Sequence, residues 1–396
     1  MAHSKLKIYN GRVLTPYRII EDGTVVVSEE GKILEVRQGN CEVPDAKELD
    51  ARGSYVAPGF IDIHVHGGGG SDFMDGSEEA FITIAELHAR YGTTSMVPTT
   101  LTSDKAGILQ TLSIYERACE KNVKGAQFLG MHLEGPYFAM NQRGAQDPRY
   151  IRNPDPSEYN DILNNASCIR RWSAAPELDG ALDFGRRLRS KNILAAIAHT
   201  DAIYEEVERA VENGYSLVTH LYSGMSGVTR RNAFRFAGVV ESAYLMDELD
   251  VEMIADGIHL PASLLRLAYK IKGADKIALI TDAMRAAGTD VHESILGSVH
   301  DGLPVLVEDG VAKLPDRSAF AGSVATADRL VRTMVHQAGI PLLDAVKMMT
   351  HTPARIMEVA DEKGALVTGK DADIVLFDEQ INVKKTLIKG HEAYSL

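Results

Sequence analysis

Residues 57–70 read APGFIDIHVHGGGG, an apolar run that ends in His-Val-His and is followed by four glycines. Side chains alternate between the two faces of a strand, so His64 and His66 point the same way, about 7 Å apart along the backbone. Neutral imidazoles are common ligands for zinc and related metals. Ordinary hydrogen bonds can also satisfy two histidines at a strand end, so the meaning of the pair depends on what other strands bring to the same place.

An alternation of strands and helices extends from this stretch. Apolar strand candidates recur over residues 55–66, 93–99, 126–134, 168–175, 193–199, 216–221, 250–256 and 276–282. Amphipathic helical segments separate most of them, as at 78–91, 104–121, 181–191, 203–213 and 261–271. Eight such units over roughly 230 residues predict an α/β fold of the (β/α)8, TIM-type barrel class. A doubly wound open sheet is the alternative, because strand order is not visible in a sequence.

Short strands and turns flank the barrel segment on both sides. They occupy most of residues 5–54 and recur over 364–388. Chain termini often lie close together, so we expect the two flanks to form one small β-sandwich domain. The predicted division is 1–54 and 361–396 for this small domain and 55–360 for the barrel.

The composition excludes several classes of partner. The chain has 396 residues, is 45% hydrophobic and 24% charged, and carries a formal net charge of −13. This charge disfavours nucleic acid and anionic membrane surfaces. No apolar run reaches the roughly 18 residues of a spanning helix, and the N-terminus has no signal-peptide pattern. Cys41, Cys119 and Cys168 are scattered and odd in number, which favours a reducing, cytoplasmic location.

Histidine or an acidic residue closes six of the eight predicted strands. The residues are His64 and His66, Glu134, His199, His220, Asp256 with His259, and Asp282. In a barrel the carboxyl ends of all strands meet at one rim, where active sites lie. Zinc takes histidine nitrogens and carboxylate oxygens, and it lowers the pKa of a bound water from about 15.7 to about 7. A carboxylate off the metal can then move the proton. Asp282 is the best candidate for that carboxylate, although a helix N-cap would also explain it.

Longer pieces around these residues resemble one family. The pieces are PGFIDIHVHG at 58–67, HLEGP at 132–136, AHT at 198–200, THLY at 219–222, ADGIH at 255–259, TDA at 281–283, AGS at 321–323 and TPAR at 352–355. As a set, spread over residues 11–377, they resemble the N-acetylglucosamine-6-phosphate deacetylase family of the amidohydrolase superfamily.

The resemblance implies a metal-dependent hydrolase, usually a homodimer. By this resemblance the main metal ligands would be Glu134, His199 and His220. Family members that keep His-x-His could hold a second metal at His64 and His66, bridged by Glu134. The implied cofactor is therefore one or two divalent metals per subunit, with zinc as the first choice and iron, cobalt or manganese as alternatives.

The resemblance also implies the reaction. Metal hydroxide would attack the N-acetyl carbonyl of N-acetylglucosamine 6-phosphate, and Asp282 would act as general acid/base. His259 would contact the substrate, and glucosamine 6-phosphate and acetate would leave. Several other amidohydrolases use a carboxylated lysine of the fourth strand as the bridge between metals. Residues 170–177 read RRWSAAPE and contain no lysine, which leaves Glu134 for that role.

The substrate contacts depart from the family pattern. After the sixth strand the family usually has an Asn-Ala pair that helps to hold the phosphate, and this chain has Ser223-Gly224. In the third loop a family Lys-Gly-Ala-His becomes RGAQ at 143–146, so Ala145 and Gln146 take the place of the sugar contact. Residues 228–235 carry three arginines where the family has one phosphate-binding arginine. Arg231 is the best match and Arg230 the alternative, and solvent-exposed arginines without a ligand are the other interpretation.

These departures leave other substrates open. The alternatives are a related N-acetylhexosamine phosphate such as N-acetylgalactosamine 6-phosphate, or a different amidohydrolase reaction by a deaminase or a peptidase. A non-catalytic binding protein on the same fold is disfavoured, because all the expected metal ligands are present.

Overall fold

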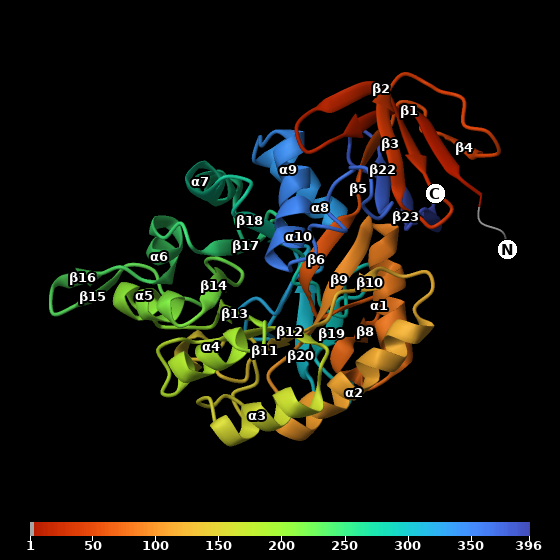
Figure 1. Ribbon diagram of the computed structural model, residues 1–396. Helices are drawn as coiled ribbons and strands as arrows, with labels where there is room; N and C mark the ends of the chain where they lie inside the picture. The colour runs from red at the N-terminus through yellow and green to blue at the C-terminus, as the bar shows by residue number, and fades with distance from the viewer. Residues whose placement is uncertain (1–3) are drawn as a thin grey trace.

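A barrel of eight parallel strands forms the centre of the computed structural model, which describes residues 4–396 (Figure 1). The strands are β6 (Phe60–Val65), β9 (Thr93–Thr100), β11 (Met131–Glu134), β12 (Ile169–Ala174), β13 (Leu194–Ile197), β14 (Tyr215–Val218), β17 (Asp250–Ile254) and β18 (Ile277–Ile280). A two-residue strand, β10 (Gln127–Phe128), lies beside β9. Most barrel strands are buried along their whole length, as expected for parallel strands covered on both faces.

The first and last strands close the barrel. The backbone N–H of Asp282, just after β18, donates to the carbonyl oxygen of His64 on β6 at 3.0 Å. Below this bond, Asp62 accepts the hydroxyl of Thr281 at 2.5 Å. The closed strand order excludes the doubly wound open sheet, so the predicted (β/α)8 barrel is confirmed.

Helices cover the outside of the barrel and follow the predicted amphipathic segments. They are α1 (Glu78–Arg90), α2 (Lys105–Lys121), α3 (Pro156–Asn165), α4 (Ala181–Arg189), α5 (Tyr204–Glu212), α6 (Val239–Leu245), α7 (Ala262–Lys272), α8 (Ala327–Arg332), α9 (Leu342–Met348) and α10 (His351–Ile356). Ser77 and Asp104 cap the first two by accepting backbone N–H groups with their side chains. A π-helical turn, Thr333–Gln337, continues α8.

Strands from both ends of the chain form the small β-sandwich domain, as predicted. They are β1 (Leu6–Leu14), β2 (Ile19–Val27), β3 (Ile33–Gln38), β4 (Lys47–Asp50), β5 (Tyr55–Pro58), β22 (Ile374–Phe377), β23 (Val383–Ile388) and β24 (His391–Ser395). The N-terminal and C-terminal parts join where β5 pairs antiparallel with β22. Apolar side chains from both parts, among them Ile8, Val25 and Ile374, share one core. The division of the chain into domains at residues 54 and 360 stays our proposal.

The expected strand over residues 55–66 is two strands. β5 belongs to the small sheet and β6 to the barrel, with Gly59 between them. A Cβ atom at Gly59 would lie 2.2 Å from the side chain of Thr94, so only glycine allows this close approach of the two chain segments.

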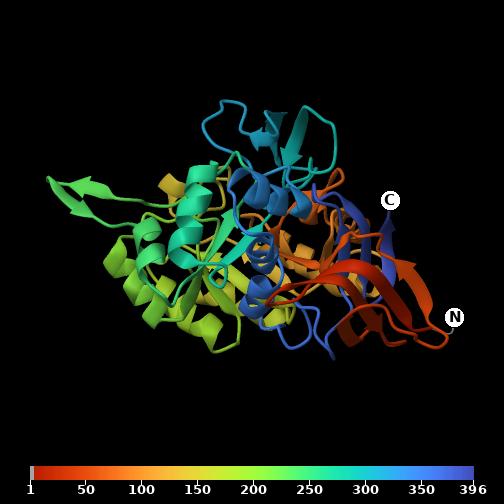
Figure 2. The ribbon, with the colours of Figure 1, turned by 90° about the horizontal axis from the view of Figure 1, so that it is seen from above.

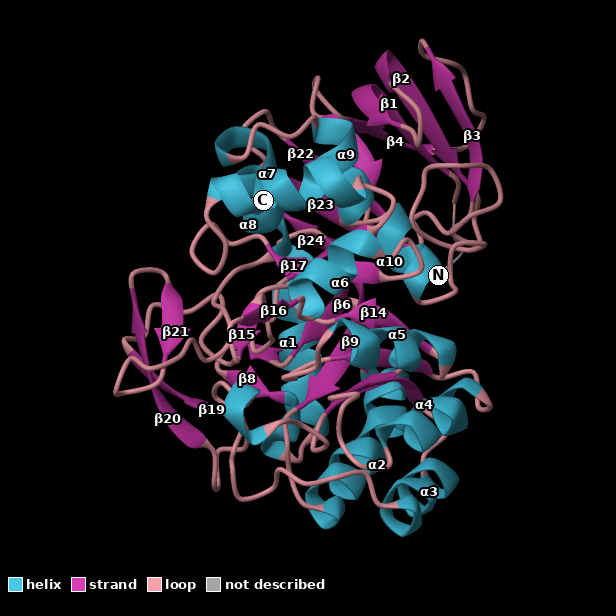
Figure 3. Ribbon diagram, turned by 90° about the vertical axis from the view of Figure 1, so that its left-hand side faces the viewer, coloured by secondary structure: helices cyan, strands magenta, loops and turns pink. Residues whose placement is uncertain are grey.

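Besides a two-residue pairing of β7 (Gly67–Gly68) with β8 (Ser71–Asp72), two larger β insertions were not anticipated. The hairpin of β15 (Thr229–Arg231) and β16 (Phe234–Phe236) projects away from the barrel (Figure 2). The second insertion is a three-stranded sheet of β19 (Glu293–Leu296), β20 (Leu303–Glu308) and β21 (Val311–Lys313), which stands at one side in Figure 3. Within residues 4–396, no helix is long and apolar enough to cross a membrane.

Candidate active site

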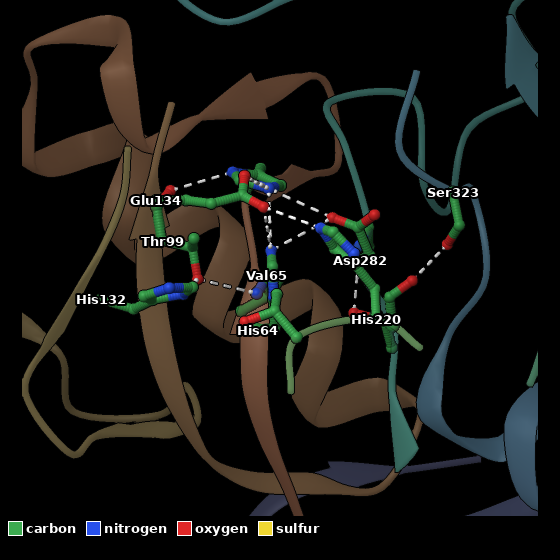
Figure 4. A network of polar contacts seen from close by, with 12 residues as sticks. His64, Val65, Thr99, His132, Glu134, His220, Asp282 and Ser323 are labelled. Atoms are coloured by element: carbon green, nitrogen blue, oxygen red, sulfur yellow. Dashed lines mark hydrogen bonds and ion pairs between the residues drawn. The ribbon is translucent and has the colours of Figure 1, made fainter. Parts of the chain in front are cut away.

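The carboxyl ends of the barrel strands bring most of the predicted site residues together (Figure 4). Glu134 is the last residue of β11, and His64 is next to last on β6. His199, His220 and Asp282 each follow their strand by two residues. All of these side chains and that of His66 are buried. These side chains therefore lie together at one rim of the barrel, as the strand ends predicted.

Three of these residues adopt a backbone conformation that is uncommon for residues other than glycine. His199, His220 and Asp282 have φ values of 45°, 31° and 48°. Such left-handed conformations cost free energy and gather at functional sites, where the surrounding structure holds them. Here they follow the strand ends and turn the side chains toward the barrel axis.

Glu134 is the centre of the cluster. Its Oε1 lies 3.0 Å from Nε2 of His220 and 3.3 Å from Nε2 of His199. On the other side, Oε2 lies 3.3 Å from Nε2 of His66, and Nε2 of His64 is 3.6 Å from Oε1. The carboxylate thus stands between two histidine pairs. Each pair forms with it a group of three donor atoms within 4.8 Å of one another.

A hydrogen-bond acceptor faces Nδ1 of each of the four histidines. For three of them it is a backbone carbonyl: Thr99 at 3.2 Å for His66, Gln142 at 2.8 Å for His199, and Ser223 at 3.1 Å for His220. For His64 it is the carboxylate of Glu252, at 3.4 Å. Because these groups only accept, each Nδ1 carries a proton, and each Nε2 faces the centre, where its lone pair can bind a metal once the ring is neutral. This donor set fits one or two divalent metals.

The electrostatics of the cluster favour positive charge at its centre. Burial would lower the pKa of His64 and His66, but the carboxylates of Glu134 and Asp282 raise these values to about 9 and about 10. For Glu134 the directions are reversed: burial would raise the pKa of this carboxyl, but the surrounding histidines hold that pKa well below its usual range. The pKa of Asp282 is lowered as well, since His64 and His66 outweigh its burial. Both carboxylates are therefore ionised at neutral pH.

Asp282 lies on the His64–His66 side of the cluster. Its Oδ1 is 3.1 Å from Nε2 of His66 and 3.4 Å from Nε2 of His64. The side chain also lines a cavity of about 260 Å³ that opens above the histidines. A carboxylate in this position can exchange a proton with a molecule in the cavity.

Most of the predicted substrate-binding residues line the same cavity. They are Ala145, Gln146, Ser223, Gly224 and His259, together with the cluster residues His66, Glu134, His199, His220 and Asp282. The ring of His259 is fixed by a 2.7 Å hydrogen bond between its Nδ1 and Asp256. Gly224 has a φ of 57°, and a Cβ atom there would lie 2.8 Å from Nδ1 of His199, so glycine is needed beside this histidine.

Gln146 touches the cluster itself. Its Nε2 donates to Oε2 of Glu134 at 2.7 Å, and its Oε1 accepts the backbone N–H of Thr102 at 2.9 Å. Both ends of the amide are thus engaged within the protein. The sequence motif placed this residue near the sugar, and no sequence signal indicated its contact with Glu134.

Arg230 and Arg231 are not among the residues that line the cavity. They are exposed on the projecting β15–β16 hairpin, where the guanidinium of Arg231 lies 5.5 Å from the ring centre of Phe236. Within one chain, the structure does not bring these arginines to the cluster.

A polar layer beneath the cluster was missed by the sequence analysis. Arg171 on β12 and Glu252 on β17 form a fully buried ion pair inside the barrel. His132 bonds to Ser173 at 2.7 Å in the same region. Barrel interiors are usually filled by branched apolar side chains, so charged residues within the apolar strands 168–175 and 250–256 were the available signal.

Comparisons with known proteins agree with this arrangement. The Amidohydrolase family profile matches residues 55–393. The chain is 34% identical over 399 residues to N-acetylglucosamine-6-phosphate deacetylase of Bacillus subtilis (strain 168), with 100% of this chain and 98% of that protein covered. It is 33% identical over 341 residues to N-acetylgalactosamine-6-phosphate deacetylase of Escherichia coli O157:H7, covering 85% of this chain and 87% of that protein.

A solved structure shares the whole fold. It is N-acetyl-D-glucosamine-6-phosphate deacetylase from Mycobacterium smegmatis in complex with N-acetyl-D-glucosamine-6-phosphate. The two chains superpose with a TM-score of 0.90 at 29% identity, covering 99% of this chain and 100% of the other. With the family profile matching most of its length and curated relatives above 30% identity, this chain belongs to the amidohydrolase family.

Proposed function

We propose that this protein is a metal-dependent deacetylase that converts N-acetylglucosamine 6-phosphate to glucosamine 6-phosphate and acetate. The observation that carries the proposal is Glu134 standing between two histidine pairs, with Asp282 facing the same cavity. The B. subtilis relative and the M. smegmatis structure, which holds the same sugar phosphate, support the choice of substrate.

Two metal positions follow from the donor atoms. Glu134, His199 and His220 would hold the first, and His64 and His66 would hold the second with Glu134 shared. A divalent metal bound there would make a water acidic and would polarise the amide carbonyl. Zinc is our first choice, and the same ligands also suit iron, cobalt or manganese.

Asp282 would move the proton. As an ionised carboxylate at the cavity wall, it can accept the proton that water gives up as the water oxygen bonds to the acetyl carbon. It then gives that proton to the amide nitrogen as the C–N bond breaks. The products are acetate and the free amine of the sugar phosphate.

The cavity residues would position the sugar. His259, held by Asp256, presents its other ring nitrogen, and Ser223 offers a hydroxyl. Gly224, Ala145 and Gln146 also line the cavity. These roles rest on their place around the cavity and on the family pattern.

We propose that the phosphate contact is made across a homodimer. Arg230 and Arg231 lie outside their own cavity, on a hairpin that extends from the barrel (Figure 2). The hairpin also exposes the apolar ring of Phe234, at 73% of its full accessibility, which a partner chain would cover. The guanidinium fork of Arg231, with Arg230 as the alternative, would then bind the phosphate of the partner subunit's substrate.

One observation favours a second substrate. The E. coli relative named N-acetylgalactosamine-6-phosphate deacetylase is 33% identical over 341 residues, the same identity that the glucosamine enzyme of Lysinibacillus sphaericus has over 380. Ser223, Gly224 and Gln146 depart from the pattern of the glucosamine family at the sugar-binding wall.

A cytoplasmic location is also part of the proposal, supported by the free state of all three cysteines.

Acetate release tests the proposal. Purified protein would be assayed against the 6-phosphates of N-acetylglucosamine, N-acetylgalactosamine and N-acetylmannosamine, with metal analysis of the same sample. We expect turnover of the first and a divalent metal content of one or two per chain. Turnover of the galactosamine epimer alone would establish the second substrate, and no acetate from any of the three would refute deacetylation of these sugars.

A further inference from the structure

The four metal-facing histidines are held in two different ways. His66, His199 and His220 donate their Nδ1 protons to backbone carbonyls, which are neutral. At Nδ1, His64 is the one of the four that faces a carboxylate, that of Glu252, across 3.4 Å. A charged acceptor makes the imidazole a stronger electron donor at its other nitrogen and fixes its tautomer and orientation more firmly.

Arg171 holds Glu252 in this position. Both terminal nitrogens of the guanidinium bond to the carboxylate, one of them at 2.8 Å. Arg171 is itself fixed by hydrogen bonds to the hydroxyl of Thr219 at 2.9 Å and to the carbonyl of Ile63 at 3.1 Å. Ile63 precedes His64 on β6, so one arginine anchors both the strand and the carboxylate that meet at this histidine.

Stability does not explain the pair. Arg171 and Glu252 are completely buried in the barrel interior. Removing two charges from water costs several kcal/mol for each ion, and well-packed apolar residues of similar volume often replace such pairs without loss. Barrel interiors ordinarily use branched apolar residues at these positions. The pair therefore has a role that apolar residues could not perform, and His64 is the cluster residue that it touches.

We propose that Glu252, anchored by Arg171, is a positioning residue that sets the metal affinity of the His64–His66 position. The inference rests on the proposed metal-dependent function and adds a determinant of how firmly the second position is filled. Among the four histidines, the Glu252 carboxylate contacts His64 at Nδ1, so the carboxylate acts through His64. At the Glu134–His199–His220 position, backbone carbonyls face Nδ1 of both histidines, and Arg171 reaches this position only through Thr219, the residue before His220. This position should therefore depend much less on the Glu252 carboxylate.

Metal binding by the intact protein tests this inference. Metal-free protein would be titrated with Zn²⁺ against a competing chelator and with Co²⁺ followed by its visible absorption spectrum. The wild-type protein should bind two ions. Glu252→Gln should weaken one of the two positions by about 10- to 100-fold and leave the other unchanged, which is the usual effect of losing such a partner.

The matched control is Asp250→Asn on the same strand. Asp250 is also paired with an arginine, Arg355, at 2.7 Å, but at the opposite end of β17 from the cluster. This variant should bind both ions as the wild type does. Equal weakening by Asp250→Asn would mean that loss of any ion pair on β17 disturbs the site, and would overturn the specific role of Glu252.

A double variant covers the case in which Glu252→Gln fails to fold because Arg171 is left as an unpaired buried charge. Arg171→Met with Glu252→Met removes both charges and keeps the barrel filled. It should weaken the His64–His66 position by a similar factor and the other position, which loses only the bond from Arg171 to Thr219, by less. Two ions bound with wild-type affinity would overturn the inference. A wild-type protein that binds only one ion would also overturn it while leaving deacetylation intact, whereas no bound metal would refute the proposed function itself.

Discussion

Asp282 combines three properties of a proton-transfer group. It is ionised at neutral pH, it lies within 3.4 Å of both histidines of the second position, and it faces the cavity. We predict that Asp282→Asn lowers kcat by about 10²- to 10⁴-fold, the usual contribution of a general acid–base group, while metal content changes little. Steady-state kinetics with metal analysis checks this. Wild-type activity in the variant would assign proton transfer to another group.

Gln146 offers a second test at the level of one side chain. Its amide bridges Glu134 and the backbone N–H of Thr102. We predict that Gln146→Leu lowers kcat and the stability of the fold, because a buried N–H left without a partner costs about 1–3 kcal/mol. Kinetics and thermal unfolding on the same sample measure both effects. A rise in KM alone, with kcat and the melting temperature unchanged, would instead show a direct sugar contact.

The protonation of His64 and His66 links metal binding to pH. Their pKa values, about 9 and about 10, are raised above the ordinary value of 6.5, so both rings are protonated in metal-free protein at pH 7.5. Filling the second position must displace these protons, so metal binding should release about two protons at pH 7.5 and strengthen as the pH rises toward 10. Calorimetry in buffers of different ionisation enthalpy counts them. No proton release at pH 7.5 would show that the rings are already neutral.

At the scale of elements, the strands were predictable and the insertions were not. Parallel strands send their carboxyl ends to one rim, so His64, Glu134, His199 and Asp282 could be brought together from their positions in the sequence alone. In the β15–β16 hairpin, β15 reads Thr-Arg-Arg, and the Phe-Arg-Phe of β16 is too short to indicate a strand. Its position relative to the barrel is set by packing that short-range patterns do not contain.

The buried ion pair of Arg171 and Glu252 could not be predicted from the sequence for a different reason. The sequence analysis used the segment around Arg171 only to show that it contains no lysine, and it predicted no role for Glu252, which lies within an apolar strand. Which face of a strand points into a barrel depends on register, and a shift of one residue reverses every side chain. The contact between Glu252 and His64, 188 residues apart, appears only when β6 and β17 are placed in the same barrel.

The proposed phosphate contact of the β15–β16 hairpin can be tested by mutation. Arg231→Ala should raise KM for N-acetylglucosamine 6-phosphate by about 10- to 100-fold, the effect of losing a hydrogen bond to a charged group worth about 1.5–3 kcal/mol. KM for the unphosphorylated sugar should not change. Arg186→Ala, which removes an exposed arginine of α4, serves as the control. Equal changes for both sugars would move the phosphate contact away from Arg231, with Arg230 and Arg235 as the next residues to test.

At the scale of the whole molecule, the cluster lies where the barrel closes. Asp282 and His64 belong to the last and first strands, and their backbones are joined by a hydrogen bond. The proposed metal ligands come from the ends of four different strands, β6, β11, β13 and β14, so a metal held by them binds the folded chain only. We predict that a chelator lowers the melting temperature, since a ligand at 100 times its dissociation constant adds about 2.7 kcal/mol. His199→Ala should respond less, and an unchanged wild-type melting temperature would show that metal does not stabilise the fold.

We propose above all that Glu134 and its histidines hold the metal on which deacetylation by this chain depends. The most direct measurement is acetate release from N-acetylglucosamine 6-phosphate by protein stripped of metal and then resupplied with measured amounts of Zn²⁺ or Fe²⁺. We predict no turnover without metal, and recovery that reaches its maximum at one or two ions per chain in the wild type but is absent in Glu134→Ala. Full acetate release by the stripped protein, or metal-dependent recovery in Glu134→Ala equal to that of the wild type, would contradict it.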